Sequence, residues 1–222
     1  MASFPFDIVG FDLDGTLLDT GDDLTAAINH TLSLARRPAL SRAEALSYVG
    51  GGVQQLIHRA LAATGETSPE LEAELLPRHS EWYQAHLTDH TRPFPGAEAA
   101  LDALAGRGVR LAVATNKREA ISRELLDRLG LARHFAVVIG GDTLGPERMK
   151  PKPDPLVEMA ARAGGGRTAF VGDSRFDVAA ARAAGMPVVA CAFGFAHEPV
   201  ATLGADAVIA HFDELVPTLA RW

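Results

Sequence analysis

The sequence predicts an α/β fold: a doubly wound, mostly parallel, Rossmann-like sheet with an inserted helical cap domain. Short apolar runs of strand length recur along the chain, segments with helical periodicity separate them, and one long stretch carries helices without a strand. Strands that alternate with helices form parallel sheets, because each crossover helix covers a face of the sheet. The expected strands are residues 8–13, 109–115, 136–139, 168–171, 187–191 and 207–209.

Residues 19–90 break this alternation and predict the inserted domain. No segment there has the pattern of a strand, and Thr20 with Asp23 fits a capping box that opens the first helix. Prolines follow this stretch and mark the return of the chain to the sheet. The expected helices are residues 24–35, 42–48, 53–63 and 69–87. The expected domains are an α/β core of residues 1–18 and 91–222 and a helical cap of residues 19–90.

Composition and charge exclude several classes of protein. The 222 residues carry a formal net charge of −7, which argues against binding to nucleic acid, whose phosphates attract basic surfaces. One cysteine excludes an internal disulfide and a multi-cysteine metal site. The sequence shows neither a signal segment nor an apolar run of the ~20 residues that span a membrane. We expect a soluble cytoplasmic protein, monomeric or homodimeric, with no membrane or nucleic-acid partner.

Two carboxylates follow the first apolar run, where it breaks into a glycine turn. On a strand, residues two apart point to the same face, so Asp12 and Asp14 are expected to project together, roughly 6.5 Å apart along the chain. In an open α/β sheet, ligands bind outside the carboxyl ends of the strands. Two like charges at this edge repel each other and call for a cation or a shared proton. The alternative is a strand that simply ends in acidic turn residues.

The second long apolar run ends in Thr115 and Asn116, just before a helix that is expected to begin near Arg118. A hydroxyl group at a strand end, followed by free N–H groups at the start of a helix, is a natural phosphate site. The alternative is that Thr115 or Asn116 only caps that helix.

Lysine is rare in this chain, which uses arginine for 18 of its 21 basic residues. The lysines are Lys117, Lys150 and Lys152, and the last two lie in a proline-rich turn. Prolines stiffen such a turn, and a rigidly mounted lysine can stabilise the charge of a phosphoryl group. A solvated turn is the alternative, and stiffness alone does not decide which of these lysines points inward.

A further apolar run ends at a glycine that is followed by Asp173. This carboxylate is expected at the same sheet edge as Asp12 and Asp14, where the three could surround a hard cation such as Mg²⁺. Asp177 follows in a Ser174-x-x-Asp177 pattern, which also fits a capping box. Whether Asp177 joins the metal site or only starts a helix is left open by the sequence.

Taken in order, these motifs resemble those of the haloacid dehalogenase superfamily, in its phosphatase branch with an inserted helical cap. The resemblance spans nearly the whole chain. It implies that Asp12 is the nucleophile, which forms an aspartyl phosphate, and that Asp14 is the general acid and base. It also implies that Thr115 contacts the phosphate and that Lys150, which begins the K-P-x-P-x-P pattern, balances its charge.

The same resemblance implies that Mg²⁺ is the cofactor. The metal would be held by the carboxylates of Asp12 and Asp173 and by the backbone carbonyl of Asp14, with Asp177 in support. Asn116, beside the phosphate contact, is expected to belong to the same phosphate site.

Within the superfamily, the chain is most similar to the phosphoglycolate phosphatases, at residues 12–20, 22–24, 48–52 and 140–144. Gly51 and Gly52 would offer backbone N–H groups to a small carboxylate, which suits 2-phosphoglycolate, although a plain loop at a helix start is the alternative. Residues 145–149 form a segment slightly longer than is usual before the family lysine, which leaves the reach of that lysine open.

Two other functions share parts of this pattern. A phosphatase or phosphomutase that acts on sugar phosphates has the same core chemistry. A receiver-like signalling module, phosphorylated on aspartate, has an acidic cluster, a threonine and a lysine, but has no use for a cap domain. Residues 19–90 contain no lysine, which argues against Schiff-base chemistry in the cap. We therefore expect a phosphatase whose partner is a small phosphorylated metabolite.

Overall fold

The computed structural model describes residues 4–195 and 198–222. The chain divides into two compact units. The core unit contains the chain up to Asp19 together with Pro93–Trp222, and the helical unit contains Thr20–Arg92. Each unit is described by itself.

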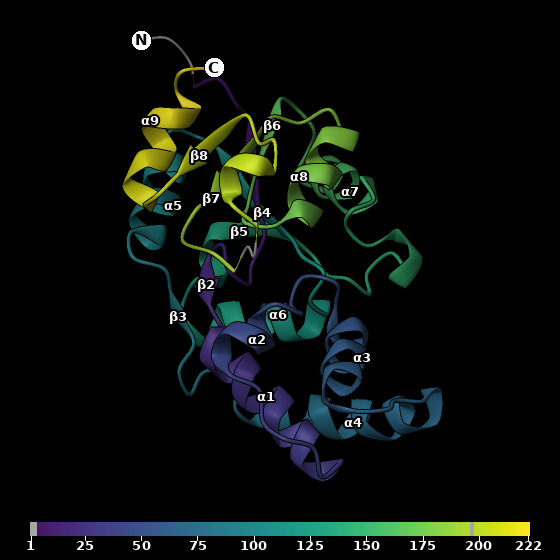
Figure 1. Cartoon of the computed structure of the whole chain (residues 1–222). Coiled ribbons are helices and arrows are strands. Elements are labelled where there is room, and N and C mark those ends of the chain that lie inside the picture. The colour runs from purple at the N-terminus through teal and green to yellow at the C-terminus, as the bar shows by residue number, and fades with distance from the viewer. Residues whose placement is uncertain (1–3, 196–197) are drawn as a thin grey trace. The chain divides into compact units, whose positions relative to one another are not determined.

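The described part of the core unit contains a six-stranded sheet with the strand order β5-β4-β1-β6-β7-β8. Neighbouring strands in this sheet pair in parallel, which confirms the predicted α/β class (Figure 1). Each strand falls within about two residues of its expected position, because apolar runs between helical segments are a strong signal for buried parallel strands. The strands are β1 (Ile8–Phe11), β4 (Arg110–Ala114), β5 (Phe135–Ile139), β6 (Thr168–Gly172), β7 (Val188–Cys191) and β8 (Ala207–Ile209).

Strand β1 lies between β4 and β6, where the strand order of the sheet reverses direction along the sequence. Phe11, at the end of β1, is paired with Val113 on one side and Val171 on the other. The carboxyl ends of the three strands therefore meet at one edge. In doubly wound sheets this reversal point is where ligands bind.

Helices cover both faces of the sheet. Helices α7 (Asp154–Arg162) and α8 (Arg175–Ala183) pack on one face, and α5 (Ala97–Ala105) and α9 (Leu215–Leu219) lie on the other (Figure 1). Gly10 of β1 allows α7 to approach, because a Cβ atom there would lie 2.3 Å from Cε of Met159. The remaining helices of this unit are α6 (Glu119–Arg128) and the short 3-10 segments Ala132–His134, Pro146–Arg148, Val200–Thr202 and Phe212–Glu214.

The first strand is shorter than the sequence predicts, since β1 ends at Phe11 instead of residue 13. The chain then turns back on itself: Leu13 O accepts hydrogen bonds from the backbone N–H groups of Leu17 and Leu18. Gly15 has a φ of +81° in this turn, a conformation that glycine adopts without strain. Asp12 and Asp14 thus lie in a turn, and the alternation that predicts a shared face does not extend to them.

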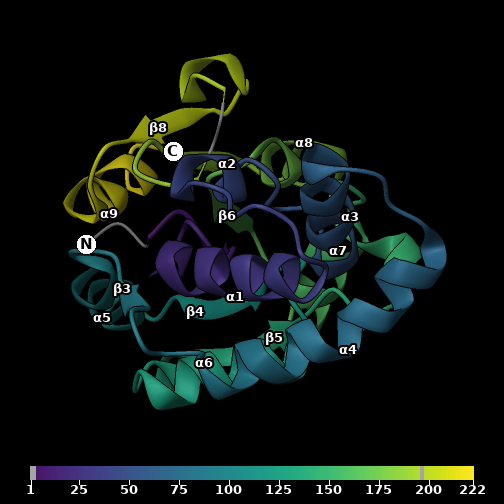
Figure 2. The same ribbon diagram turned by 60° about the horizontal axis from the view of Figure 1, so that its bottom comes forward.

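The described residues of the helical unit form four helices, and α1 and α4 run side by side (Figure 2). Their apolar faces enclose a separate core that includes Ile28, Leu32, Ile57, Leu61 and Leu75. The helices are α1 (Gly21–Leu34), α2 (Arg42–Leu46), α3 (Val53–Thr64) and α4 (Pro69–Ala85), close to the bounds expected from periodicity.

The capping box expected at the start of α1 is wrong. Thr20 is the N-cap residue, but its side chain makes no capping hydrogen bond. The buried carboxylate of Asp23 instead accepts hydrogen bonds from the backbone N–H groups of His90 and Thr91 and from Thr91 Oγ1. Asp23 therefore fixes the end of the helical unit to its beginning, which local sequence could not reveal because the partners are 67 and 68 residues away.

The chain passes between the units through two short strands, β2 (Leu18–Asp19) and β3 (Arg92–Pro93), which pair with each other.

Across the described residues, no helix has both the length and the apolar character needed to cross a membrane.

Candidate active site

Three of the predicted site residues follow the ends of adjacent strands in the core unit. Asp12 follows β1, Thr115 follows β4 and Asp173 follows β6. All three are buried polar residues, with 8%, 3% and 2% of their surface exposed. A charged group that leaves water needs a partner, so the contacts of these side chains indicate what the site is built to do.

Lys150 joins two of the buried carboxylates. Its Nζ lies 2.8 Å from Oδ1 of Asp12 and 2.6 Å from Oδ1 of Asp177. Burial alone would lower the pKa of Lys150, but the negative charges of Asp12 and Asp177 outweigh burial and raise it. Lys150 is therefore a fixed positive charge beside Asp12.

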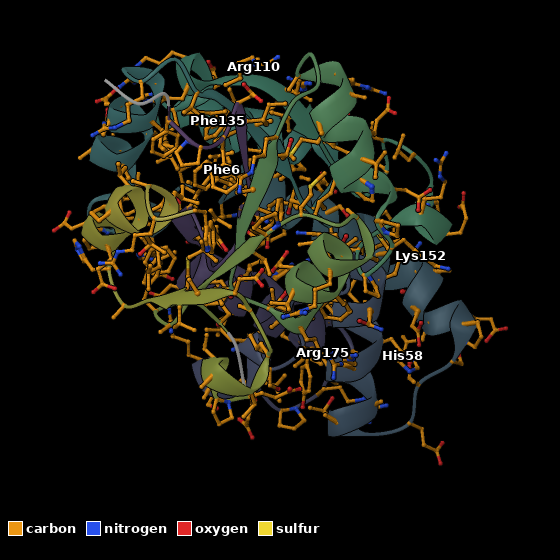
Figure 3. The ribbon with its side chains drawn as sticks, turned by 90° about the horizontal axis from the view of Figure 1, so that it is seen from above. Phe6, His58, Arg110, Phe135, Lys152 and Arg175 are labelled. Carbon is orange, nitrogen blue, oxygen red and sulfur yellow. The ribbon has the colours of Figure 1, made fainter. Side chains whose placement is uncertain are left out.

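Asn116 holds the main chain of Lys150 in the proline-rich turn. The side chain of Asn116 donates from Nδ2 to Lys150 O at 2.8 Å and accepts from Lys150 N at 2.9 Å. Lys152 has an exposed side chain (Figure 3). The structure thus decides which lysine points inward. The segment before it, which includes the 3-10 turn Pro146–Arg148, does not keep Lys150 from reaching Asp12.

Asp177 has two roles that the sequence left as alternatives. Its Oδ2 accepts hydrogen bonds from the backbone N–H of Asp173 and from the N–H and Oγ of Ser174, which forms the predicted capping box of α8. Its Oδ1 accepts from Lys150. One oxygen of Asp177 accepts three hydrogen bonds and the other contacts the Lys150 ammonium, so Asp177 fits a supporting place beside a metal better than a place as a direct ligand.

Asp173 is held by the turn after β1 and by a later loop. Thr16 donates from Oγ1 to Oδ1 of Asp173 at 3.1 Å, and the backbone N–H of Phe195 donates to Oδ2 at 2.6 Å. Burial, followed by the charges of Asp177 and Asp12, raises the pKa of Asp173 well above its usual value. Sequence reasoning missed Thr16, although its hydroxyl stands two residues after Asp14 in the same turn.

A Cβ atom at Gly15 or Gly194 would lie 2.3 Å from an atom of Asp173. Both positions therefore need glycine, because any larger residue would displace the carboxylate.

The acidic cluster has the donor set of a divalent cation site. Asp12, Asp173 and Asp177 each offer a carboxylate oxygen, and these oxygens lie within 4.8 Å of one another. Burial raises the pKa of Asp12 to about 6, although Lys150 opposes this shift. A hard cation stabilises the ionised form of carboxylates that are buried close together. Carboxylate oxygens are ligands that suit Mg²⁺. The residues present therefore fit the predicted metal.

Asp14 contacts a different lysine. Lys117 Nζ donates to both of its carboxylate oxygens, at 3.0 and 2.9 Å. The two side chains are largely buried, with 8% of Lys117 and 13% of Asp14 exposed. Sequence reasoning did not assign Lys117 to the site. The signal that could have found it is the rarity of lysine in this chain. Of the three lysines, Lys117 and Lys150 contact aspartates of the site, whereas Lys152 is exposed.

Neither Thr115 nor Asn116 caps the following helix. Helix α6 begins at Glu119, and its N-cap residue is Arg118. Thr115 Oγ1 accepts a hydrogen bond from the backbone N–H of Lys117 at 3.3 Å, and the amide of Asn116 holds Lys150. The capping alternative is therefore wrong for both residues.

Gly51 and Gly52 belong to the helical unit, at the start of α3. Gly52 is the N-cap residue of that helix and has a φ of +84°. A Cβ atom on Gly51 would overlap the side chain of Gln55. The backbone thus favours glycine at Gly52, whereas at Gly51 the flexible Gln55 side chain could move aside.

Comparison with known proteins relates this arrangement to a family. Residues 9–191 match the family described as haloacid dehalogenase-like hydrolase. A phosphoglycolate phosphatase of Mesorhizobium japonicum is 41% identical over 217 residues, which cover 96% of this chain and 95% of the relative. Another, from Cereibacter sphaeroides, is 42% identical over 214 residues, which cover 96% of this chain and 97% of the relative.

A solved structure has the same fold. The crystal structure of a predicted phosphoglycolate phosphatase from Haemophilus somnus 129pt matches with a TM-score of 0.90 and 29% sequence identity. The match covers 96% of this chain and 97% of that one.

The chain belongs to the haloacid dehalogenase-like hydrolases, which confirms the family predicted from the motifs. Within that family it is an enzyme of the phosphoric monoester hydrolase class, similar to the phosphoglycolate phosphatases.

Proposed function

We propose that the protein is a Mg²⁺-dependent phosphatase that hydrolyses 2-phosphoglycolate to glycolate through an aspartyl phosphate on Asp12. The observation that carries this proposal is the contact of Asp12 with the buried ammonium of Lys150, at the edge of the sheet where ligands bind. The names of the similar relatives support the choice of substrate. The cytoplasmic location and the oligomeric state stay predictions.

A phosphate monoester repels an incoming carboxylate, so its charge must be balanced before Asp12 can attack. Lys150 supplies one positive charge. The Thr115 hydroxyl and the N–H groups beside it would donate hydrogen bonds to phosphate oxygens. Bound Mg²⁺ would polarise the phosphate and balance its remaining charge. Asp12, Asp173 and the backbone carbonyl of Asp14 would hold the metal, with Asp177 in support.

Two displacements complete the reaction. In the first, Asp12 forms a bond to phosphorus, the bond to the ester oxygen breaks, and protonated Asp14 gives its proton to that oxygen. In the second, Asp14 takes a proton from water as the water oxygen bonds to phosphorus. The bond to Asp12 then breaks and inorganic phosphate is released.

Mg²⁺ should stabilise the protein at neutral pH and much less in acid. Burial raises the pKa of both Asp12 and Asp173, so protons compete with the metal as the pH falls. At about pH 7.5, a metal concentration about 100-fold above Kd should raise Tm by about 5–10 °C. At about pH 5, below the raised pKa of Asp12, a proton competes with the metal for this carboxylate, and the rise should be much smaller. Thermal unfolding with Mg²⁺ and with a chelator measures both values.

Two variants control for non-specific salt effects. Asp173→Asn should lose the metal-induced rise in Tm, whereas Asp213→Asn should keep it, because the Asp213 side chain is 78% exposed. Equal rises at both pH values, or an unchanged rise in Asp173→Asn, would contradict the assigned metal site.

The wild-type enzyme should prefer 2-phosphoglycolate over phosphohexoses in kcat/KM by at least about tenfold, as a site built for a small carboxylate would. Phosphate release from a set of small phosphate esters, with and without Mg²⁺, measures this preference. A preference for phosphohexoses would replace the assignment with a sugar phosphatase. Transfer of phosphate between sugar positions would indicate a phosphomutase, and a stable aspartyl phosphate without turnover would indicate a receiver-like module.

Gly51 and Gly52 are proposed to bind the carboxylate of the substrate through backbone N–H groups. Gly52→Ala, strained at a φ of +84°, should raise KM for 2-phosphoglycolate but not for ethyl phosphate, which lacks the carboxylate. Gly108→Ala is a matched control, because Gly108 has a φ of +78° and open space around its Cβ position. A rise in KM of equal size for both substrates would reject the role.

A further inference from the structure

Each of the two aspartates after β1 contacts a lysine of its own. Asp12 contacts Lys150, which Asp177 also holds, whereas Lys117 donates to both oxygens of Asp14. The proposed reaction gives Lys150 the task of balancing charge on the phosphate. It gives no task to Lys117, although this lysine is as thoroughly enclosed as Asp14, with 8% of its side chain exposed.

The main chain of Lys117 is fixed by the ends of two strands. Its N–H donates to Thr115 Oγ1, and its carbonyl accepts from the N–H of Gly141, which follows β5, at 2.8 Å. Gly141 can approach this closely because it lacks a side chain: a Cβ atom there would lie 2.4 Å from Asn116 O. The sheet thus fixes the main chain of Lys117, and the burial of its side chain limits where the ammonium group can lie.

Asp14, by contrast, lies in the tight turn after β1. The end torsion of an aspartate side chain is broad and has no strong preference of its own. The orientation of its carboxyl group is therefore set by the groups that contact it. A contact to both oxygens, at 3.0 and 2.9 Å, restricts that rotation.

We propose that Lys117 is a positioning residue for Asp14. Its ammonium group holds the carboxyl group in the orientation from which the proton passes to the ester oxygen and, in the second step, is taken from water. When one oxygen of Asp14 carries the proton, Lys117 keeps a hydrogen bond to the other. This inference rests on the role of Asp14 in the proposed function.

The competing explanation is that Lys117 binds the phosphate directly. The two explanations differ in how they depend on the leaving group. An alkoxide, as in 2-phosphoglycolate, needs a proton in order to leave, whereas p-nitrophenolate does not. A residue that acts through Asp14 should change kcat/KM only for esters with an alkoxide leaving group. The parameter kcat/KM is the right measure because it reports the steps up to phosphoryl transfer. A residue that binds phosphate affects both kinds of ester.

The experiment uses the full chain with Mg²⁺ and compares Lys117→Met, Asp14→Asn and the double variant on both esters. Lys117→Met should lower kcat/KM for 2-phosphoglycolate by about 10–100-fold, the cost of a misplaced catalytic group, and change that for p-nitrophenyl phosphate by less than about threefold. In the Asp14→Asn background, Lys117→Met should cause no further loss, because two residues that act as one unit are not additive. Lys152→Met, which removes an exposed lysine, is the matched control and should resemble the wild type.

A second variant separates positioning from folding. Lys117→Gln keeps N–H donors, so it should recover part of the activity that Lys117→Met loses, and both should keep the metal-induced rise in Tm. Equal losses on both esters, or losses that multiply in the double variant, would overturn the inference and leave the proposed function standing. Wild-type activity in Asp14→Asn would instead overturn the role of Asp14, and the inference with it.

Discussion

Asp12→Asn should lower kcat for 2-phosphoglycolate by at least about 10⁴-fold, since removing a nucleophile leaves only the background catalysis of the rest of the site. Asparagine has nearly the same shape but does not attack phosphorus at a useful rate. Steady-state phosphate release measures the loss. Incubation with substrate followed by acid quench should trap phosphate on the wild-type chain and not on the variant. Residual activity within about tenfold of the wild type would exclude Asp12 as the nucleophile.

The same variant should stay folded, which distinguishes lost chemistry from lost structure. Burial raises the folded-state pKa of Asp12 to about 6, above its usual value of 3.8. Above about pH 6 the folded state therefore holds this charge at a cost, and the neutral amide removes that cost. Without metal, at neutral pH, Asp12→Asn should unfold at the same temperature as the wild type or at a higher one. A marked fall in Tm would mean that the contact with Lys150 stabilises the fold more than burial opposes it.

Lys150→Ala is expected to have the largest effect on stability. Removing one partner of a buried ion pair leaves an uncompensated charge, and here both Asp12 and Asp177 lose the ammonium group between them. The free energy of unfolding should fall by about 3–5 kcal/mol. Activity should be lost as well, because the phosphate no longer meets a fixed positive charge. Urea unfolding and phosphate release measure the two effects.

Lys152→Ala is the control for this prediction, because it removes a lysine from the same proline-rich turn but from an exposed side chain (Figure 3). It should change the free energy of unfolding by less than about 0.5 kcal/mol. Mg²⁺ should restore part of the stability that Lys150→Ala loses, because it supplies positive charge to the same carboxylates. Equal stability of the two variants would show that the buried contacts of Lys150 contribute nothing measurable.

Periodicity predicted the secondary structure closely, and it failed at two places where specific hydrogen bonds override the pattern. The strands and the four helices of the helical unit are present near their expected bounds. The strand before Asp12 ends early because Leu13 O accepts from Leu17 and Leu18. The expected capping box fails because Asp23 contacts His90 and Thr91 instead.

Within the site, the sequence identified residue types better than partners. The motifs drew attention to Asp12, Asp173 and Lys150, and their places at the sheet edge follow from the rule that parallel strands end together. Asp177 could be read as a cap or as a site residue, and its two oxygens do both. Lys117 was visible only as an uncommon residue, because nothing local connects it to Asp14, 103 residues earlier.

The sequence by itself determined the α/β class, the helical insertion, the family and the residues that carry charge at the strand ends. These follow from short-range patterns, namely periodicity and motifs at the ends of apolar runs. Only the tertiary structure decided that the Lys152 side chain is exposed, that Asp12 and Asp14 contact different lysines, and that Asn116 holds the main chain of Lys150. The reason is physical: burial and pairing of charges depend on atoms brought together by strand order, and strand order joins segments that lie far apart along the chain.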